Sequence, residues 1–68
     1  MIVFKLKELM ETQAIGQREL SRRTGIRQAT ISDYVNNKVK HINTENLDIL
    51  CIYFKCNVED IIEFKGFE

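Results

Sequence analysis

Hydrophobic positions change their spacing several times along the chain, and each change predicts a new element. Apolar residues alternate over residues 2–5, as in a strand, and recur at helical spacing from Leu6 onward. Helical spacing returns in later segments, and alternation returns after Ile62. The expected elements are a strand at about 2–5, helices at about 6–13, 17–23, 28–36, 44–55 and 58–62, and a strand at about 62–67.

The segment from Gln17 to Asn36 has the pattern of a helix, a glycine turn and a second helix. Leu20 and Ser21 fall on the inner face of the first helix, where a small side chain allows a close crossing. Gly25 marks the turn, since glycine adopts positive φ without steric cost. The polar positions of the second helix then face outward, available to a groove of DNA. These positions are Arg27, Gln28, Thr30, Ser32, Asp33 and Asn36.

The segments after this motif predict how the domain is closed. Asn43 has the position of a helix N-cap, and Asn57 with Asp60 has the spacing of another helix start. The terminal strands are expected to pair, placing Ile62 and Phe64 beside Phe4. We therefore expect one all-α domain over residues 1–68, with five helices and a short two-stranded antiparallel sheet made from the two ends.

The helix at 44–55 carries more apolar residues than one core stripe needs. Leu47, Leu50, Cys51 and Phe54 form the expected core stripe, and three apolar residues lie on other faces. Such a surplus implies contact with another element or with a second subunit. The surplus residues are Ile49, Ile52 and Tyr53; Phe4, Phe64 and Phe67 are likewise expected on a sheet and dimer surface.

The formal net charge is +0, but the charges are unevenly distributed along the chain. Residues 1–43 carry eight basic and four acidic side chains, a net charge of +4. Residues 44–68 carry two basic and six acidic side chains, a net charge of −4. A basic half around the helix-turn-helix would orient the domain toward a polyanion, although charges also segregate by chance in short chains.

Several classes of function lack the residues that they require. His41 is the single histidine and no CxxC or HxxxH spacing occurs, so we expect no metal and no cofactor. Cys51 and Cys56, on a helix and its exit, have poor spacing for a disulfide and are expected to be reduced. With no Ser-His-acid set, glycine-rich phosphate loop, signal peptide or membrane span, the chain is expected to be a cytoplasmic protein without enzymatic activity.

The motif QRELSRRTGIRQATISDYVNNK resembles the helix-turn-helix of the lambdoid phage repressor and Cro proteins, the xre family of transcriptional regulators. The segments LKELMETQ and NTENLDILCIYFKCNVEDII resemble the first and the closing helices of that family. The resemblance therefore covers nearly the whole chain. It implies a lambda-repressor-like five-helix domain that binds double-stranded DNA.

The resemblance also implies roles for individual residues. Gln17 matches a family glutamine that touches phosphate at a helix start, and Gln28 matches one that reads a base and couples to the first. Arg27 stands where the family usually has a serine or threonine N-cap, which brings a guanidinium to the groove. Asp33 differs from the residue that a tight DNA binder would be expected to have at this position, because its carboxylate repels nearby phosphate. The expected DNA-binding residues are Gln17, Arg18, Arg27, Gln28, Ala29, Thr30, Ser32, Asp33, Asn36, Asn37 and Lys38.

Two functions remain open at this point. The first is a transcriptional regulator, most simply a repressor, that binds a palindromic operator as a homodimer. The second is an antitoxin or another protein-interaction module of the same fold, whose partner, such as a toxin, contacts the acidic half and the surface of Ile49, Ile52 and Tyr53. The neighbouring gene would discriminate between them.

Overall fold

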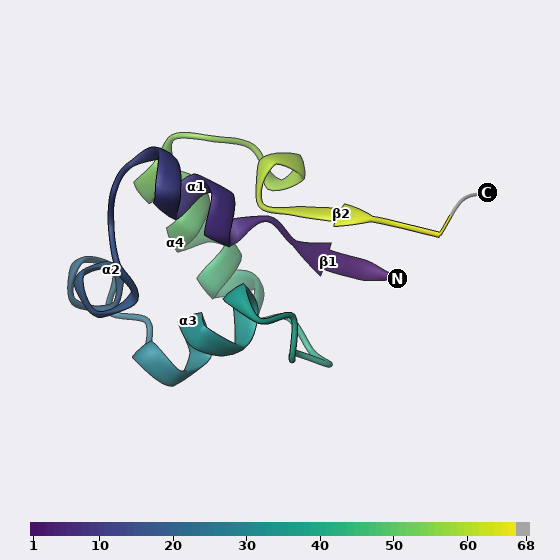
Figure 1. Cartoon of the computed structure of the whole chain (residues 1–68), viewed down its shortest axis with the longest axis horizontal. Coiled ribbons are helices and arrows are strands. Elements are labelled where there is room, and N and C mark those ends of the chain that lie inside the picture. The colour runs from purple at the N-terminus through teal and green to yellow at the C-terminus, as the bar shows by residue number, and fades with distance from the viewer. Residues whose placement is uncertain (67–68) are drawn as a thin grey trace.

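The computed structural model describes residues 1–66, and in this part four α-helices accompany a small sheet (Figure 1). The expected position of Phe67 on a sheet and dimer surface lies outside the described residues. In chain order the elements are β1 (Ile2–Phe4), α1 (Leu6–Thr12), α2 (Gln17–Thr24), α3 (Gln28–Val35), α4 (Thr44–Phe54), the 3-10 turn η1 (Val58–Asp60) and β2 (Ile62–Phe64).

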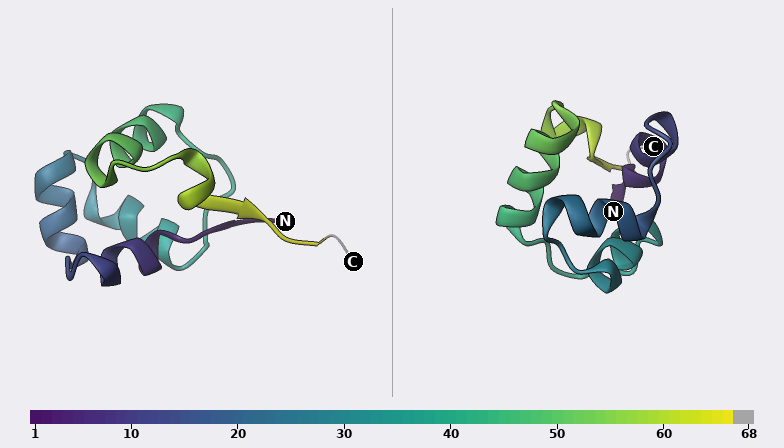
Figure 2. Two further views of the ribbon diagram at one scale, coloured as in Figure 1. Left: turned by 90° about the horizontal axis from the view of Figure 1, so that it is seen from above. Right: turned by 90° about the vertical axis from the view of Figure 1, so that its left-hand side faces the viewer.

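The two strands pair antiparallel, as expected, and join the two ends of the chain. Ile2 lies opposite Phe64, and Phe4 lies opposite Ile62. Figure 2 shows this ribbon projecting from the body of helices, with the amino end at its far tip. The projection makes the molecule 38 Å long but only 21 and 20 Å across. Phe4, at the inner end of β1, is buried in the body.

One hydrophobic core lies between the helices and the inner end of the sheet. Phe4 stacks on Tyr34 with ring centroids 4.5 Å apart and an interplanar angle of 6°. The Tyr34 hydroxyl accepts a hydrogen bond from Asn46 Nδ2 at 3.0 Å, so the buried ring keeps a polar partner. The buried residues of the core are Phe4, Leu6, Met10, Leu20, Ile26, Ile31, Tyr34, Leu50, Phe54 and Ile61.

The turn between α2 and α3 has the geometry that its sequence predicts. Gly25 is in the left-handed conformation with φ 78°, and its N–H donates to the Ser21 carbonyl at 2.9 Å. The Ser21 hydroxyl donates to the Ile26 carbonyl at 2.5 Å, which ties the inner face of α2 to the start of α3. Thr24 adds a second tie, because its hydroxyl accepts the Ile26 N–H at 3.2 Å. The angle between the two helices is thus fixed locally.

Helix α4 begins at a cap that the sequence predicts. The Asn43 side chain accepts hydrogen bonds from the N–H groups of Glu45 and Asn46 at 2.8 and 3.3 Å. Leu50 and Phe54 of the expected core stripe are buried, while Leu47 and Cys51 are half-buried against the core. No helix in residues 1–66 is both long enough and apolar enough to span a membrane.

The prediction of a fifth helix at about 58–62 is wrong in both the length and the type of helix. Residues Val58–Asp60 form a single 3-10 turn, which Asp60 stabilises by accepting the Asn57 N–H on Oδ2 at 3.0 Å. A longer helix is excluded because the Ile61 carbonyl accepts the Lys5 N–H at 2.6 Å and the chain then enters β2. Pairing with the amino end therefore takes the backbone groups that a further helical turn would need.

Candidate nucleic-acid interface

Helix α3 separates packing residues from exposed polar residues along its length. Ile31 and Tyr34, three residues apart, are buried in the core. Gln28, Ala29 and Asp33 lie on the opposite, exposed side. Thr30 and Ser32 are half-buried at the borders between the two faces, while Asn36 is exposed where the helix ends. The buried residues therefore fix the rotation of α3, and its outward face consists mostly of polar side chains of the types that can bind base edges or phosphate.

The first turns of α2 and α3 both lack a side-chain cap. Gly16 is the N-cap of α2, and Arg27 is the N-cap of α3 with extended backbone (φ −58°, ψ 140°). The Arg27 side chain is exposed, as are Arg18 in the first turn of α2 and Gln28 in the first turn of α3. Uncapped N–H groups next to exposed donors suit phosphate oxygens.

The side chains of Gln17 and Gln28 form no hydrogen bond with another residue in the described structure, so the coupling that the family resemblance implies is absent from the unbound domain. Gln17 is half-buried and Gln28 is exposed. Both amides are thus available for a ligand.

The end of α3 holds side chains with structural contacts that the sequence did not predict. Asn36 Nδ2 donates to the carbonyl and to the hydroxyl of Ser32 at 2.9 and 3.3 Å. Asn37 is left-handed with φ 56°, and its Oδ1 accepts the Phe4 N–H at 2.6 Å. The Asn37 side-chain oxygen therefore anchors β1, and its amide nitrogen is left available for a ligand. Lys38 follows with an exposed side chain.

Ion pairing divides the basic side chains into two groups. Glu19 binds Arg22 through one carboxylate oxygen and Arg23 Nε through the other at 2.6 Å. These hydrogen bonds, first that from Arg22 and then that from Arg23, lower the pKa of Glu19 to about 2. In residues 1–66 the basic groups without an ion pair include Arg18, Arg27, Lys38 and Lys40. Lys5, Lys7 and Lys55 also lack an ion pair in this part of the chain, so unpaired positive charge lies around α1 and after α4 as well as at the start of α2 and beside both ends of α3.

Comparison with known proteins agrees with this geometry. The family model of the Cro/C1-type HTH DNA-binding domain matches residues 5–66. The chain belongs to the Cro/C1-type helix-turn-helix family. It is also 30% identical over 67 residues to the uncharacterized HTH-type transcriptional regulator YozG of Bacillus subtilis (strain 168), a match that covers 98% of this chain and 80% of the relative.

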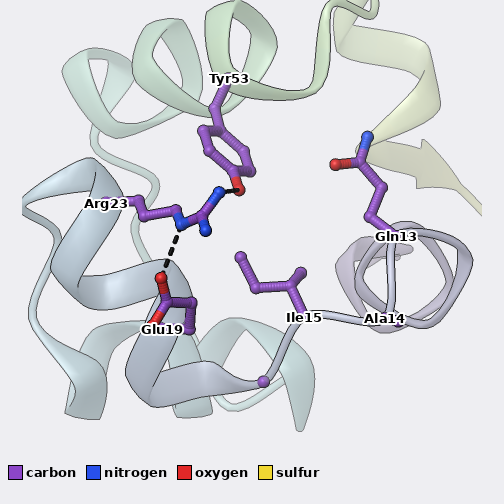
Figure 3. A pocket seen from close by; sticks show the side chains of 7 residues that line it. Gln13, Ala14, Ile15, Glu19, Arg23 and Tyr53 are labelled. Atoms are coloured by element: carbon purple, nitrogen blue, oxygen red, sulfur yellow. Dashed lines mark hydrogen bonds and ion pairs between the residues drawn. The ribbon is translucent and has the colours of Figure 1, made fainter.

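Away from the outward face of α3, this Cro/C1-type domain has two adjoining hollows near α2 and α4. One is bordered by Glu19, Arg23 and Tyr53 together with the turn from Gln13 to Gly16 (Figure 3). Arg23 Nη1 lies 3.5 Å from the Tyr53 hydroxyl across it. The second hollow is lined by Arg23, Thr24, Ile49, Ile52 and Tyr53. The surplus apolar residues of α4 therefore gather beside α2.

Proposed function

We propose that this domain binds double-stranded DNA with sequence specificity and regulates transcription, acting as a repressor on a palindromic operator. The observation that carries the proposal is the exposed polar face of α3, held in fixed orientation by Ile31, Tyr34 and the Gly25 turn. The family match to residues 5–66 and the relative from Bacillus subtilis, itself named a transcriptional regulator, support it. A regulator of transcription acts where the chromosome lies, so we place the protein in the cytoplasm.

In this proposal the first turn of α3 reads the bases. The Gln28 amide is exposed and can bind adenine N6 and N7 together, while the Ala29 methyl can contact a thymine methyl. Asp33 can accept a hydrogen bond from cytosine N4. Thr30 and Ser32, at the borders of the face, are suited to nearby phosphates or base edges.

The remaining residues bind the phosphate backbone. Gln17 and Arg18 lie at the start of α2, where uncapped N–H groups and the positive end of the helix dipole attract an anion. Arg27 enters at the start of α3. The DNA backbone on the far side of the groove is contacted by Asn36, Asn37 and Lys38. Asn37 donates from its side-chain amide nitrogen.

Selection of binding sites from random DNA duplexes, carried out at two salt concentrations, tests this proposal. We expect enrichment of one sequence with two-fold symmetry. The logarithm of the binding constant should fall with the logarithm of the salt concentration, with a slope of roughly 0.9 for each of several phosphate contacts. Replacing Lys38 with Gln should reduce the slope by about 1. The matched Lys65→Gln variant, which removes a lysine paired with Glu63 on the sheet, should leave it unchanged. Absence of any enriched sequence would overturn the proposal.

A second function is favoured by the hollow beside α4. Ile52 is 76% exposed, although α4 is otherwise well packed, and Ile49 and Tyr53 lie next to it. Exposed apolar side chains in a hollow are typical of protein contacts. This surface supports an antitoxin or other interaction module, whose partner would contact Ile52. The test is copurification with the product of a neighbouring gene. If the Ile52→Asp variant lost this partner but still bound DNA, the interaction function would be established.

A further inference from the structure

The carboxyl end of α4 folds back over the helix and brings two cysteines together. Lys55 is left-handed with φ 54° and ψ 51°. The Cys56 N–H donates to the Cys51 carbonyl at 3.1 Å, and the Lys55 N–H donates to the Ile52 carbonyl at 3.3 Å. This pair of hydrogen bonds defines the Schellman motif, in which the residue after the left-handed one packs on the residue five positions earlier. Here those two residues are Cys56 and Cys51.

The backbone distance is compatible with a disulfide. Bond lengths on either side of the 3.1 Å hydrogen bond leave the two Cα atoms at most about 7 Å apart. Cysteines that form disulfides have Cα atoms about 4.4–6.8 Å apart. A straight helix would instead direct residues five apart away from each other. The left-handed turn at Lys55 is therefore what makes the pairing possible.

Both thiols are free, and Cys56 lies close enough to Cys51 for the two thiols to interact. Burial raises the pKa of the Cys56 thiol, and the neighbouring Cys51 and Asp60 raise it further, with a hydrogen bond between the two thiols contributing. The raised pKa keeps Cys56 protonated at neutral pH. Both side chains are half-buried rather than enclosed, which leaves an approach for a small reagent.

We propose that Cys51 and Cys56 are a redox modification site that forms a reversible intramolecular disulfide with a low-molecular-weight disulfide such as oxidised glutathione as the oxidant. In the first step the thiolate of one cysteine attacks the reagent, forms a mixed disulfide and releases one reduced thiol. In the second step the other cysteine, as thiolate, attacks the protein sulfur of the mixed disulfide and releases the second reduced thiol. The two cysteines lose two electrons and two protons, which the reagent gains.

The disulfide would cross-link the last turn of α4 to the segment that leads into η1. In the reduced protein this turn is held by the two backbone hydrogen bonds and the contact between the thiols. Oxidation would therefore secure the end of α4 without moving the chain, and reduction would release it.

Equilibration of the purified protein in glutathione buffers of graded redox ratio tests the proposal. Thiols are trapped by alkylation, and intact mass reports the disulfide, which lacks two hydrogen atoms and carries no alkyl group. The equilibrium constant for closing the disulfide is expected to be at least about tenfold larger in native buffer than in concentrated urea, because the native turn holds the thiols together. Dithiothreitol should restore two alkylatable thiols.

A relocated thiol pair provides the matched control. The variant Cys51→Ser with Ile52→Cys keeps nearly the same sequence separation but moves one thiol to the outward face of α4, where Ile52 is 76% exposed. Its equilibrium constant should match that of the natural pair in urea and should lack the native increase. The proposal is overturned if the natural pair shows no increase on folding, if the relocated pair shows the same increase, or if the native protein accumulates mainly glutathione adducts or cross-linked dimers.

Discussion

Gln28 illustrates how single residues in this domain are divided between folding and recognition. Its side chain is exposed and forms no hydrogen bond with the described protein, so the fold does not depend on it. Ile31, one turn along the same helix, is fully buried and contributes to the core alone. A residue whose chemistry suits a base edge and whose loss costs no packing is the clearest place to test recognition.

We expect Gln28→Ala to lower the preference for the selected operator over scrambled DNA by about 1–3 kcal/mol, because the bidentate contact to adenine is lost. Non-specific affinity and the thermal midpoint should be unchanged. Competition binding with labelled operator measures the preference. The matched variant Gln13→Ala removes an exposed glutamine at the end of α1 and should keep full selectivity. An unchanged preference in Gln28→Ala would exclude this residue from base reading.

Glu19 predicts a pH dependence of stability. Its pKa in the folded state is about 2, against an ordinary value of 4.5, because Arg22 and Arg23 hold the carboxylate. A lowered pKa stabilises the fold above the ordinary value, and this contribution is lost as the pH falls from about 4.5 toward 2. The difference in urea midpoint between the natural chain and Glu19→Gln should therefore shrink over that range.

Glu11→Gln is the control for this series. Glu11 is an exposed carboxylate of α1 and pairs with no basic side chain among residues 1–66. The difference in urea midpoint between Glu11→Gln and the natural chain should not shrink in this way as the pH falls. If the Glu19→Gln difference were flat between pH 2 and 4.5, the ion pairs with Arg22 and Arg23 would have no effect on stability in solution.

Local chemistry explains which residue roles the sequence could predict. The cap at Asn43 and the turn at Gly25 depend on residues within a few positions, so composition and spacing were sufficient. The hydrogen bond from the Phe4 N–H to the Asn37 side chain joins residues 33 positions apart, and no periodic pattern in the sequence predicts it. The approach of Cys51 and Cys56 was missed for another reason, since the left-handed conformation falls on Lys55, a residue type that does not predict it.

At the scale of elements, the turn between α2 and α3 depends on one backbone conformation. Gly25 has φ 78°, and a Cβ built there would meet no atom within 4 Å, so strain alone decides the cost of a side chain. Gly25→Ala should lower the free energy of unfolding by about 1–2 kcal/mol. Gly16 has equal space but φ −88°, so Gly16→Ala brings no such strain, loses only the preference for glycine over alanine at an N-cap, and should cost less than Gly25→Ala. Urea unfolding measures both, and equal losses would contradict the strain argument.

The amino-terminal strand depends on a side chain from the end of α3. Asn37→Gly keeps the left-handed backbone accessible but removes the acceptor of the Phe4 N–H. We expect a loss of about 1 kcal/mol and faster hydrogen exchange at the Phe4 amide, measured by NMR. Asn37→Asp retains an acceptor oxygen and should preserve most of the protection. Equal exchange in the natural chain and in Asn37→Gly would show that β1 is held by sheet pairing alone.

The strand ends and the fifth helix show where element prediction fails. The sheet itself was predictable from alternation at both ends, and Ile62 lies opposite Phe4 as expected, whereas Phe64 lies opposite Ile2. The segment Val58–Asp60 has a genuine helix start in Asn57 and Asp60, yet helix formation stops after one turn. The competing interaction is the hydrogen bond from Lys5 to Ile61, which depends on a segment more than fifty residues away. Local signals predict where a helix begins better than how far it extends.

The whole molecule offers one short helix for reading the operator that we propose. The radius of gyration is 11.4 Å, and one α3 of eight residues contacts a single stretch of major groove. Its opposed charges, +4 in residues 1–43 and −4 in residues 44–68, favour one orientation on DNA without a net attraction at long range. Under the proposed function we therefore expect a second copy on the adjacent half-site, related by two-fold symmetry to the first.

This arrangement predicts how binding responds to the spacing between half-sites. Two copies on one face of the duplex need half-site centres about 10 base pairs apart, or a multiple of that spacing. Inserting about 5 base pairs at the operator centre should abolish tight binding, because the second half-site is carried to the opposite face. Deleting one half-site should reduce affinity to the same level. Gel-shift titration measures both, and sedimentation of the intact complex should give two protein chains per duplex. Binding that is insensitive to the insertion would mean that each domain acts alone, so that specificity would have to come from the contacts of one α3.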